Sequence, residues 1–518
     1  MIASKLFFSV FCVSVSGLIT GCSFQYQRAP SQPFDPKNKV SKPFRELKPE
    51  HAVTFLVGLK PYLGKGTSEI KPASVLFLQS AGKSLLLKDS LGMEHKSVDI
   101  NLSWRKVPLL IPKKLERQVV GPFSSFESAQ RMAERLREKG ISALIAHPKE
   151  WEVWISHGIE VPKEINVLPW TKSITSEIRP VLQKANGEIL LSGPLKIEAP
   201  DGLYFNGGRY LGPFWLKADA YGSWTFIEEV PLHRYLQGVV PHEIGSNVPK
   251  QALEAQAVLA RTWALANSQR FAIDGYHLCS DTQCQVYKDP QKASQIVRGA
   301  IANSAGRYLS WNKKPIHAVY HASNGGVMAS GTEAWSMSPL PYLRVQLDGS
   351  NKWGERFILP LQNRSSVKTL LRQVDGAYGN THPRFRWVRF FNSEELKNAL
   401  DLFASSNILP SRVKVLERGA SGRVLALEIF DEGTQLRRVL KLDEIRRVLR
   451  NLPSTLFIVE KLKDGMWKFS GGGFGHGVGL SQAGAIDLAR RGWNASTILS
   501  HYYPGTRYRT LQYLPKTP

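Results

Sequence analysis

The stretch that decides the fold runs from Leu232 to Ala266 and reads LHRYLQGVVPHEIGSNVPKQALEAQAVLARTWALA. Its second half predicts a helix, with Asn247 as a candidate cap and Pro249 in the first turn. Small and apolar residues recur there at helical spacing. They are Leu253, Ala257, Ala260 and Ala264. Because most of them are alanines, we expect this helix to pack closely against other elements.

The first half of the stretch ends in a proline followed by an acid. Pro241 has a fixed φ and no N–H, which predicts that regular structure stops just before His242 and Glu243. The Glu243 carboxylate would then lie on a turn at the start of a buried helix, where a general acid could work. The alternative is structural, because an acid before a helix also stabilises its positive N-terminus.

A second motif, residues 469–482, is rich in glycine and reads FSGGGFGHGVGLSQ. No Lys-Ser or Lys-Thr pair follows it, so it does not have the pattern of a phosphate-binding loop. The glycines instead predict a backbone that passes close to a ligand or to the Glu243 turn. Ser481 is predicted to cap a helix from Gln482 to Arg491. His476 is a candidate site residue, and a buried histidine with satisfied hydrogen bonds is the alternative.

The two motifs together resemble the stage II sporulation protein D family (SpoIID/LytB). The resemblance lies in YLQGVVPHEI…ALEAQAVLARTWA and in FGHGVGLSQAGA…ILSHYYPGT, and covers about residues 180–510. It implies that Glu243 is the catalytic acid of a peptidoglycan lytic transglycosylase. Such an enzyme cleaves the glycan between MurNAc and GlcNAc and leaves a 1,6-anhydro end. Some members are described as enhancers of a wall amidase, so a glycan-binding protein that cuts nothing is the alternative.

Further candidates for the substrate site come from the local patterns and the resemblance. Residues 317–326, HAVYHASNGG, read as a strand that runs into a glycine turn with short polar groups suited to sugar hydroxyls. A CQVY element at 284–287, typical of the family, contributes two more residues. The substrate-binding residues that we predict around Glu243 are Arg261, Gln285, Tyr287, Ser323, Asn324, His476, Ser481 and Gln482.

The chain has four cysteines, of which Cys279 and Cys284 form a close pair. With His277 nearby, the pair could bind structural zinc or form a disulfide. Some relatives bind zinc here through two cysteines and two histidines, but Gln283 stands where they carry a histidine. Because a structural zinc site needs four ligands, the sequence favours the disulfide. The predicted reaction requires no cofactor.

The first 22 residues predict export. Lys5 and the short apolar run Leu6–Leu18 precede Ile19-Thr20-Gly21-Cys22, which fits the cleavage site of a bacterial lipoprotein; an ordinary signal peptide is the alternative. Lipid on Cys22 would tether the protein to a membrane on the exported, periplasmic side.

The net charge of +25 favours a polyanionic partner. An exported protein meets no chromosome, so nucleic acid is excluded. The charge leaves an anionic lipid surface or an acidic wall polymer as partners. The family resemblance implies peptidoglycan glycan strands and an N-acetylmuramoyl-L-alanine amidase.

The length of 518 residues predicts several domains. A flexible tether is expected at 23–50. Within residues 51–160, Phe126, Ala129, Ala133 and Leu136 recur at helical spacing and predict a helix in the segment from Ser125 to Lys139. The pattern VGPFSSFESAQRMAERLREKGISA…WEVWI resembles the SPOR domain, a small αβ module that binds glycan stripped of its peptides; a generic αβ module is the alternative. Residues 165–515 are predicted to form one mixed catalytic domain with a β-rich first half. The predicted fold class is therefore α+β.

Overall fold

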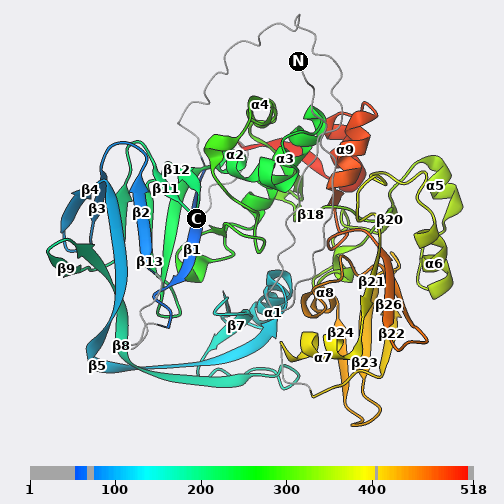
Figure 1. Ribbon diagram of the computed structural model, residues 1–518, viewed down its shortest axis with the longest axis horizontal. Helices are drawn as coiled ribbons and strands as arrows, with labels where there is room; N and C mark the ends of the chain where they lie inside the picture. The colour runs from blue at the N-terminus through cyan, green and yellow to red at the C-terminus, as the bar shows by residue number, and fades with distance from the viewer. Residues whose placement is uncertain (1–52, 67–74, 403–406, 512–518) are drawn as a thin grey trace, which may run out of the picture. The chain divides into compact units, whose positions relative to one another are not determined.

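The computed structural model describes residues 53–66, 75–402 and 407–511. The predicted signal peptide, the lipidation site at Cys22 and the tether lie outside these residues. The described chain is a mixed α+β protein, as the sequence predicts, and its first half is rich in strands (Figure 1). No helix within the described ranges is both long and apolar enough to cross a membrane.

A seven-stranded sheet joins distant parts of the chain. β1 pairs antiparallel with β14 and parallel with β15. The strands, in spatial order, are β15 (Leu278–Cys279), β1 (Thr54–Leu63), β14 (Trp224–Pro231), β13 (Phe214–Ala218), β10 (Leu195–Glu198), β3 (Leu85–Lys88) and β4 (Glu94–Ser97). Because β14 runs directly into helix α2 (Leu232–Glu243), this sheet fixes where the helix that bears Glu243 begins.

A second sheet has two exceptionally long strands that form a ribbon. The strands are β12 (Gly208–Tyr210), β11 (Leu203–Phe205), β2 (Leu76–Ser80), β5 (Asp99–Phe123), β7 (Trp151–Ser156) and β6 (Leu144–Ala146), with β8 (Leu168–Lys184) paired to β5 and to β9 (Gly187–Leu190). The β5–β8 register shifts between Pro108 and Lys113. Figure 1 shows the ribbon bending as it runs toward α1 and β7.

Helix α1 (Phe126–Glu138) confirms the helix expected in the SPOR-like region. Ser125 caps it by accepting a hydrogen bond from the Ser128 N–H. The buried residues are those that the periodicity predicts: Phe126, Ala129, Ala133 and Leu136. The region is nevertheless not a separately packed module. β1 completes a sheet with β14, and β5 pairs with β8 across the expected boundary near residue 160.

The helical layer is built around α3 (Lys250–Ala266), whose small side chains let other helices approach on several sides. Its neighbours are α2, α4 (Gln295–Asn303), α9 (Gln482–Arg490) and α10 (Ala495–Tyr502), and the short 3₁₀ helices nearby are η2 (Ala272–Asp274) and η3 (Pro290–Lys292). Two small sheets lie in this part of the chain: β17 (Lys314–Pro315), β16 (Arg307–Trp311) and β28 (Arg507–Thr510), then β18 (Tyr320–His321) with β27 (Leu480–Ser481).

Two local predictions in the opening stretch are wrong. Helix α2 continues through Pro241, so Glu243 is its last residue and not part of a turn. The Ile244 N–H closes the helix on the Val240 carbonyl at 3.2 Å, and Pro241, near the end, removes only one N–H donor. The residue that precedes α3 is Pro249, which offers no side-chain cap, and not Asn247.

Residues between β18 and β27 form a part with hydrophobic cores of their own. Its elements are β19 (Val327–Met328), η4 (Gly331–Glu333), β20 (Gln346–Leu347), α5 (Asn351–Arg356), α6 (Arg364–Arg372), β21 (Arg386–Phe391), α7 (Ser393–Asp401), β22 (Arg412–Arg418), β23 (Val424–Phe430), β24 (Arg437–Lys441), α8 (Asp443–Val448), β25 (Phe457–Lys461) and β26 (Trp467–Gly472). Two three-stranded sheets, β21-β26-β25 and β22-β23-β24, dominate it. The prediction had assigned this part to the catalytic domain.

Candidate active site

Glu243 lies at the end of α2, and its carboxyl group takes part in two hydrogen bonds. The Val286 N–H donates to Glu243 Oε1 at 2.7 Å. The Tyr320 hydroxyl is also hydrogen-bonded to the carboxyl group. Burial raises the pKa of Glu243, and the two hydrogen bonds lower it by less, so that the pKa stays above its ordinary value. A carboxyl group in this environment holds its proton to a higher pH than an exposed glutamate.

The position of Val286 depends on a short covalently closed loop. Cys279 and Cys284 form a disulfide, as the sequence favours, and Cys279 lies in β15 against β1. The following segment runs along α2, where the Lys288 N–H donates to the Gly238 carbonyl at 3.1 Å. A Cβ on Gly238 would lie 2.4 Å from the Tyr287 ring, so only glycine permits this approach. The disulfide and Gly238 together bring the Val286 N–H to Glu243.

Gln285 connects Tyr320 to the interior. The Tyr320 hydroxyl donates to Gln285 Oε1 at 2.9 Å. Gln285 Nε2 points the other way and donates to the Ala260 carbonyl and the Tyr235 hydroxyl, each at 3.3 Å. The carbonyl can only accept, so the Gln285 amide is fixed with its oxygen toward Tyr320. Gln285, predicted to touch substrate, is only 1% exposed and instead orients a tyrosine beside the acid.

His476 holds the backbone of the same tyrosine. Its Nε2–H donates to the Tyr320 carbonyl at 2.9 Å, and its Nδ1 accepts from the Val478 N–H at 3.1 Å. Its ring lies 4.8 Å from the Trp335 ring and 5.1 Å from the His321 ring. Burial, with Arg446 nearby, lowers the pKa of His476 to about 3. His476 is therefore the neutral histidine with satisfied hydrogen bonds that the sequence offered as the alternative. Its hydrogen bond to the carbonyl fixes the backbone of Tyr320.

Two of the predicted substrate-binding residues belong to the interior. Arg261 is 3% exposed, and its Nη1 donates to the Arg307 carbonyl at 2.9 Å. The Tyr287 hydroxyl donates to Glu228 Oε2 at 2.7 Å, in a buried contact. Both predicted substrate contacts therefore lie in the interior, where each side chain has an internal hydrogen-bond partner.

The glycine turn near residue 324 is also internal. Ser323 bridges to Phe474, and Asn324 Nδ2 donates to Asp348 Oδ2 at 2.6 Å. A Cβ on Gly473, whose φ is 84°, would lie 2.7 Å from the Ser323 carbonyl oxygen. Gly473 therefore packs against this turn. Ser323 and Asn324, which were predicted to bind sugar, are 2% and 1% exposed, so the structure places both side chains in the interior.

The start of α9 holds the last two predicted residues. Ser481 caps the helix, as expected, by accepting from the Gly484 N–H at 3.2 Å. It is 1% exposed and hence structural rather than substrate-binding. Gln482 is partly exposed, and its Nε2 donates to Gln256 Oε1 on α3 at 3.4 Å. Solvent therefore still reaches Gln482.

The residues around the disulfide do not fit a structural zinc ion. Zinc would require Cys279 and Cys284 as separate thiolates, and here they are bonded to each other. His277 Nδ1 accepts a hydrogen bond from the Leu56 N–H at 2.9 Å. Among the residues that the structure describes, no group of three or more His, Cys, Asp or Glu is placed to bind a metal.

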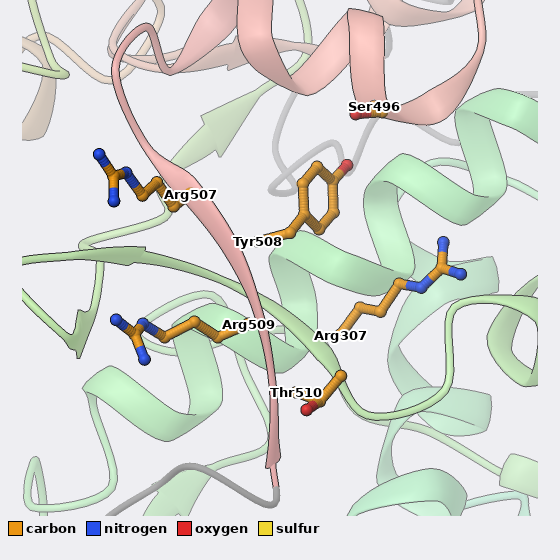
Figure 2. A pocket seen from close by; sticks show the side chains of 6 residues that line it. All are labelled: Arg307, Ser496, Arg507, Tyr508, Arg509 and Thr510. Carbon is orange, nitrogen blue, oxygen red and sulfur yellow. The ribbon is translucent and has the colours of Figure 1, made fainter.

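A pocket elsewhere in the molecule does not add to this site. It has a volume of about 430 Å³ and lies along β16 and β28. Arg307 pairs with Thr510 across the two strands and Arg509 pairs with Tyr308, so the two arginines project from opposite faces. Figure 2 shows Arg307 pointing away from Arg507 and Arg509. The three cations do not converge on one ligand.

Tyr320 is the main residue that the sequence reasoning missed. It lies in residues 317–326, where the predicted contacts were the small polar residues of the turn. No local signal marks Tyr320, because only the pairing of β18 with β27 shows that it lies beside Leu480 of the second motif. A residue from one motif beside the other is where an active-site contact is expected.

Comparison with known proteins bears on this geometry. Residues 220–311, which contain α2, α3, Glu243 and the disulfide loop, match the family described as Stage II sporulation protein. This part of the chain is similar to the SpoIID domain. Residues 329–479 match a different family, a domain of unknown function (DUF8618). That range covers the part that has its own hydrophobic cores and also most of the glycine-rich motif at 469–482.

Three relatives extend the SpoIID similarity. The Stage II sporulation protein D of Bacillus subtilis is 27% identical over 301 residues, which are 54% of this chain and 75% of that protein. That of Bacillus amyloliquefaciens is 28% identical over 302 residues, 54% and 74% of the two chains. The Amidase enhancer of Bacillus subtilis is 26% identical over 290 residues, 52% of this chain and 40% of that protein. The SPOR resemblance stays a prediction.

Proposed function

We propose that this protein is a peptidoglycan lytic transglycosylase and that Glu243 is its general acid and base. The observation that carries the proposal is the state of Glu243 within the part similar to the SpoIID domain. It is a largely buried carboxyl group with a raised pKa, held by the Val286 N–H and the Tyr320 hydroxyl. General acids in glycoside cleavage need a raised pKa of this kind, because they must carry a proton near neutral pH.

One carboxyl group is sufficient for this reaction. Protonated Glu243 gives its proton to the glycosidic oxygen as the bond from MurNAc C1 to that oxygen breaks. The resulting carboxylate then takes the proton of the MurNAc C6 hydroxyl as this oxygen bonds to C1. The products are a 1,6-anhydro end and a free GlcNAc hydroxyl, and Glu243 is again protonated. No water is consumed, so the second carboxylate of ordinary glycosidases has no part to play.

The contacts of Glu243 suit both halves of this cycle. When Glu243 is protonated, its O–H can donate to the Tyr320 oxygen, because the Tyr320 proton is directed to Gln285 Oε1. When Glu243 is ionised, the Tyr320 hydroxyl can rotate and donate to the carboxylate. The Val286 N–H stabilises the ionised form at 2.7 Å. Burial favours the protonated form of Glu243, and the hydrogen bonds favour its ionised form. Because these effects oppose each other, the two forms are closer in free energy.

A second candidate function is enhancement of a wall amidase without glycan cleavage. The similarity to the Amidase enhancer of Bacillus subtilis favours it. The basic charge of +25 is compatible with binding an acidic wall polymer in either case. In this alternative Glu243 is a structural acid, and a wall amidase is the partner.

The decisive experiment compares the wild type, Glu243→Gln and Glu254→Gln on peptidoglycan, intact and stripped of peptides by an amidase. Glutamine keeps the size of Glu243 but cannot transfer a proton, so we expect loss of 1,6-anhydro products by at least two to four orders of magnitude. Glu254 is the matched control on α3, where it accepts from Asn303 Nδ2 at 2.9 Å and lies 3.7 Å from Lys250 Nζ. Glu254→Gln should leave the rate within a few-fold.

Two results would contradict the proposal. Release of 1,6-anhydro products by Glu243→Gln at the wild-type rate would remove this residue from the chemistry. A wild type that releases none from either substrate, yet stimulates a purified wall amidase, would favour the enhancer function. Mass spectrometry separates the outcomes, because an anhydro end is lighter than a hydrolysed end by one water.

A further inference from the structure

A second site lies where β2 meets the β11–β12 hairpin. The pocket there has a volume of about 420 Å³. Two aromatic rings line it, Phe77 on β2 and Tyr204 on β11, and they are 52% and 48% exposed. Large aromatic side chains normally bury most of their surface, so two half-exposed rings in one pocket indicate a surface that binds something.

The strand register places these rings on one face of the sheet. Tyr204 pairs directly with Gln79, and Phe77 lies two residues before Gln79 on the same strand. The alternate residues Leu76, Leu78 and Leu203 point to the other face and are buried in the core. The buried leucines on the inner face stabilise the fold, and the core does not need the Phe77 and Tyr204 rings on the outer face.

The polar groups around the rings decide the kind of ligand. The Gln79 and Asn206 amides and the Lys60 ammonium group line the same pocket. Sugars present apolar C–H faces that pack on aromatic rings and edges of hydroxyl and N-acetyl groups that bond to amides. We propose that this pocket is a second glycan-binding site, for a strand of N-acetylated hexosamines, separate from the cleavage site at Glu243.

The hairpin that carries Tyr204 is braced against the active-site segment. Lys292 Nζ, in η3, donates to the Gly207 carbonyl at the hairpin turn at 3.4 Å. The Tyr210 ring lies 5.9 Å from the Tyr287 ring, next to Val286. A glycan held in the pocket is therefore attached to the same rigid part of the molecule as Glu243. The pocket would hold the wall polymer during cleavage, and only this use of it rests on the proposed function.

The test uses the full chain bearing Glu243→Gln, which keeps the ligand intact, and measures binding of chitotetraose by calorimetry. Phe77→Ala and Tyr204→Ala should each weaken binding about tenfold, as expected for the loss of one aromatic contact. Phe390→Ala is the matched control, because Phe390 on β21 is also an aromatic side chain at 52% exposure. It should leave the affinity unchanged. Gln79→Ala is a milder variant that removes only an amide from the exposed face.

The outcomes separate this inference from the proposed function. Unchanged chitotetraose affinity in Phe77→Ala, Tyr204→Ala and Gln79→Ala, with melting temperatures equal to the parent, would overturn the inference. If these variants lose binding while the wild type cleaves no glycan, the pocket stands and the transglycosylase proposal fails. If the wild type cleaves, Tyr204→Ala should raise KM on long strands with little change in kcat, since the ring touches no reacting atom.

Discussion

Tyr320 and Gln285 form a hydrogen-bonded pair 2.9 Å apart behind the acid Glu243. The direction of the bond is set by Gln285, whose Nε2 is committed to the Ala260 carbonyl. Tyr320 is in turn held at its backbone by His476. The candidate acid is thus controlled by a tyrosine that two separate motifs position, and this arrangement makes several properties of the protein measurable.

Removal of the Tyr320 hydroxyl should alter the pH dependence of glycan cleavage. In Tyr320→Phe the carboxylate of Glu243 loses a donor that lowers its pKa, so the pKa should rise further. The limb of the pH–rate profile where activity falls with increasing pH should move to higher pH, while the maximal rate drops about tenfold or more. Tyr508→Phe, on β28, is the control and should change neither. A profile that scales down without moving would show that Tyr320 does not act on the titration of Glu243.

Neutralising Glu243 should stabilise the protein at neutral pH. The folded state raises the pKa of Glu243, so the protein binds this proton more tightly when folded. The unfolding free energy of the wild type therefore falls as pH rises from the unfolded pKa, near 4.3, through the folded pKa. Glu243→Gln avoids that loss. Its melting temperature should exceed the wild type at pH 8, and the advantage should disappear at pH 4. An equal difference at both pH values would contradict the raised pKa.

Breaking the disulfide should weaken both the fold and the site. The Cys279–Cys284 bridge closes a short loop, for which chain entropy gives about 2 kcal/mol of stability. The double variant Cys279→Ser/Cys284→Ser should lose this amount in urea unfolding, and glycan cleavage should fall because Val286 is held less firmly. Metal analysis of the reduced wild type tests the zinc alternative. One zinc per chain, with stability restored, would show that the pair is a metal ligand set.

The lipoprotein prediction for Cys22 has a direct test. The residue follows Ile19-Thr20-Gly21 and lies outside the described residues. We expect the mature protein from membranes to begin at Cys22 and to carry the mass of acyl chains, and Cys22→Ala to leave the protein unanchored. An N-terminal peptide with an unmodified cysteine, or with the leader still attached, would contradict the prediction.

Local sequence signals were sufficient where structure depends on near neighbours. The spacing of Phe126, Ala129, Ala133 and Leu136 predicted the buried face of α1, and Ser481 predicted the start of α9. Glu243 was found through its motif, although α2 extends two residues further than Pro241 suggested. These features follow from periodicity and capping, which the sequence contains within a few residues.

The interior placement of the polar residues could not be predicted in the same way. Arg261, Ser323 and Asn324 have the chemistry of sugar ligands, but each satisfies a backbone or side-chain partner far along the chain. The pairing of β1 with β14, which crosses the expected boundary near residue 160, is equally non-local. Such partners depend on which strands meet, and single-residue chemistry does not contain that information.

The pairing of β18 with β27 can form only after most of the chain has been synthesised. The strand Tyr320–His321 cannot pair until Leu480–Ser481 has been made, and the ribosome makes that segment only after residues 329–479. Contacts this distant in sequence form late, because a long loop must first be closed. A truncated or half-made chain therefore contains Glu243 but lacks the segment that holds Tyr320 in place. The surroundings of Glu243 are therefore completed only when synthesis is nearly finished.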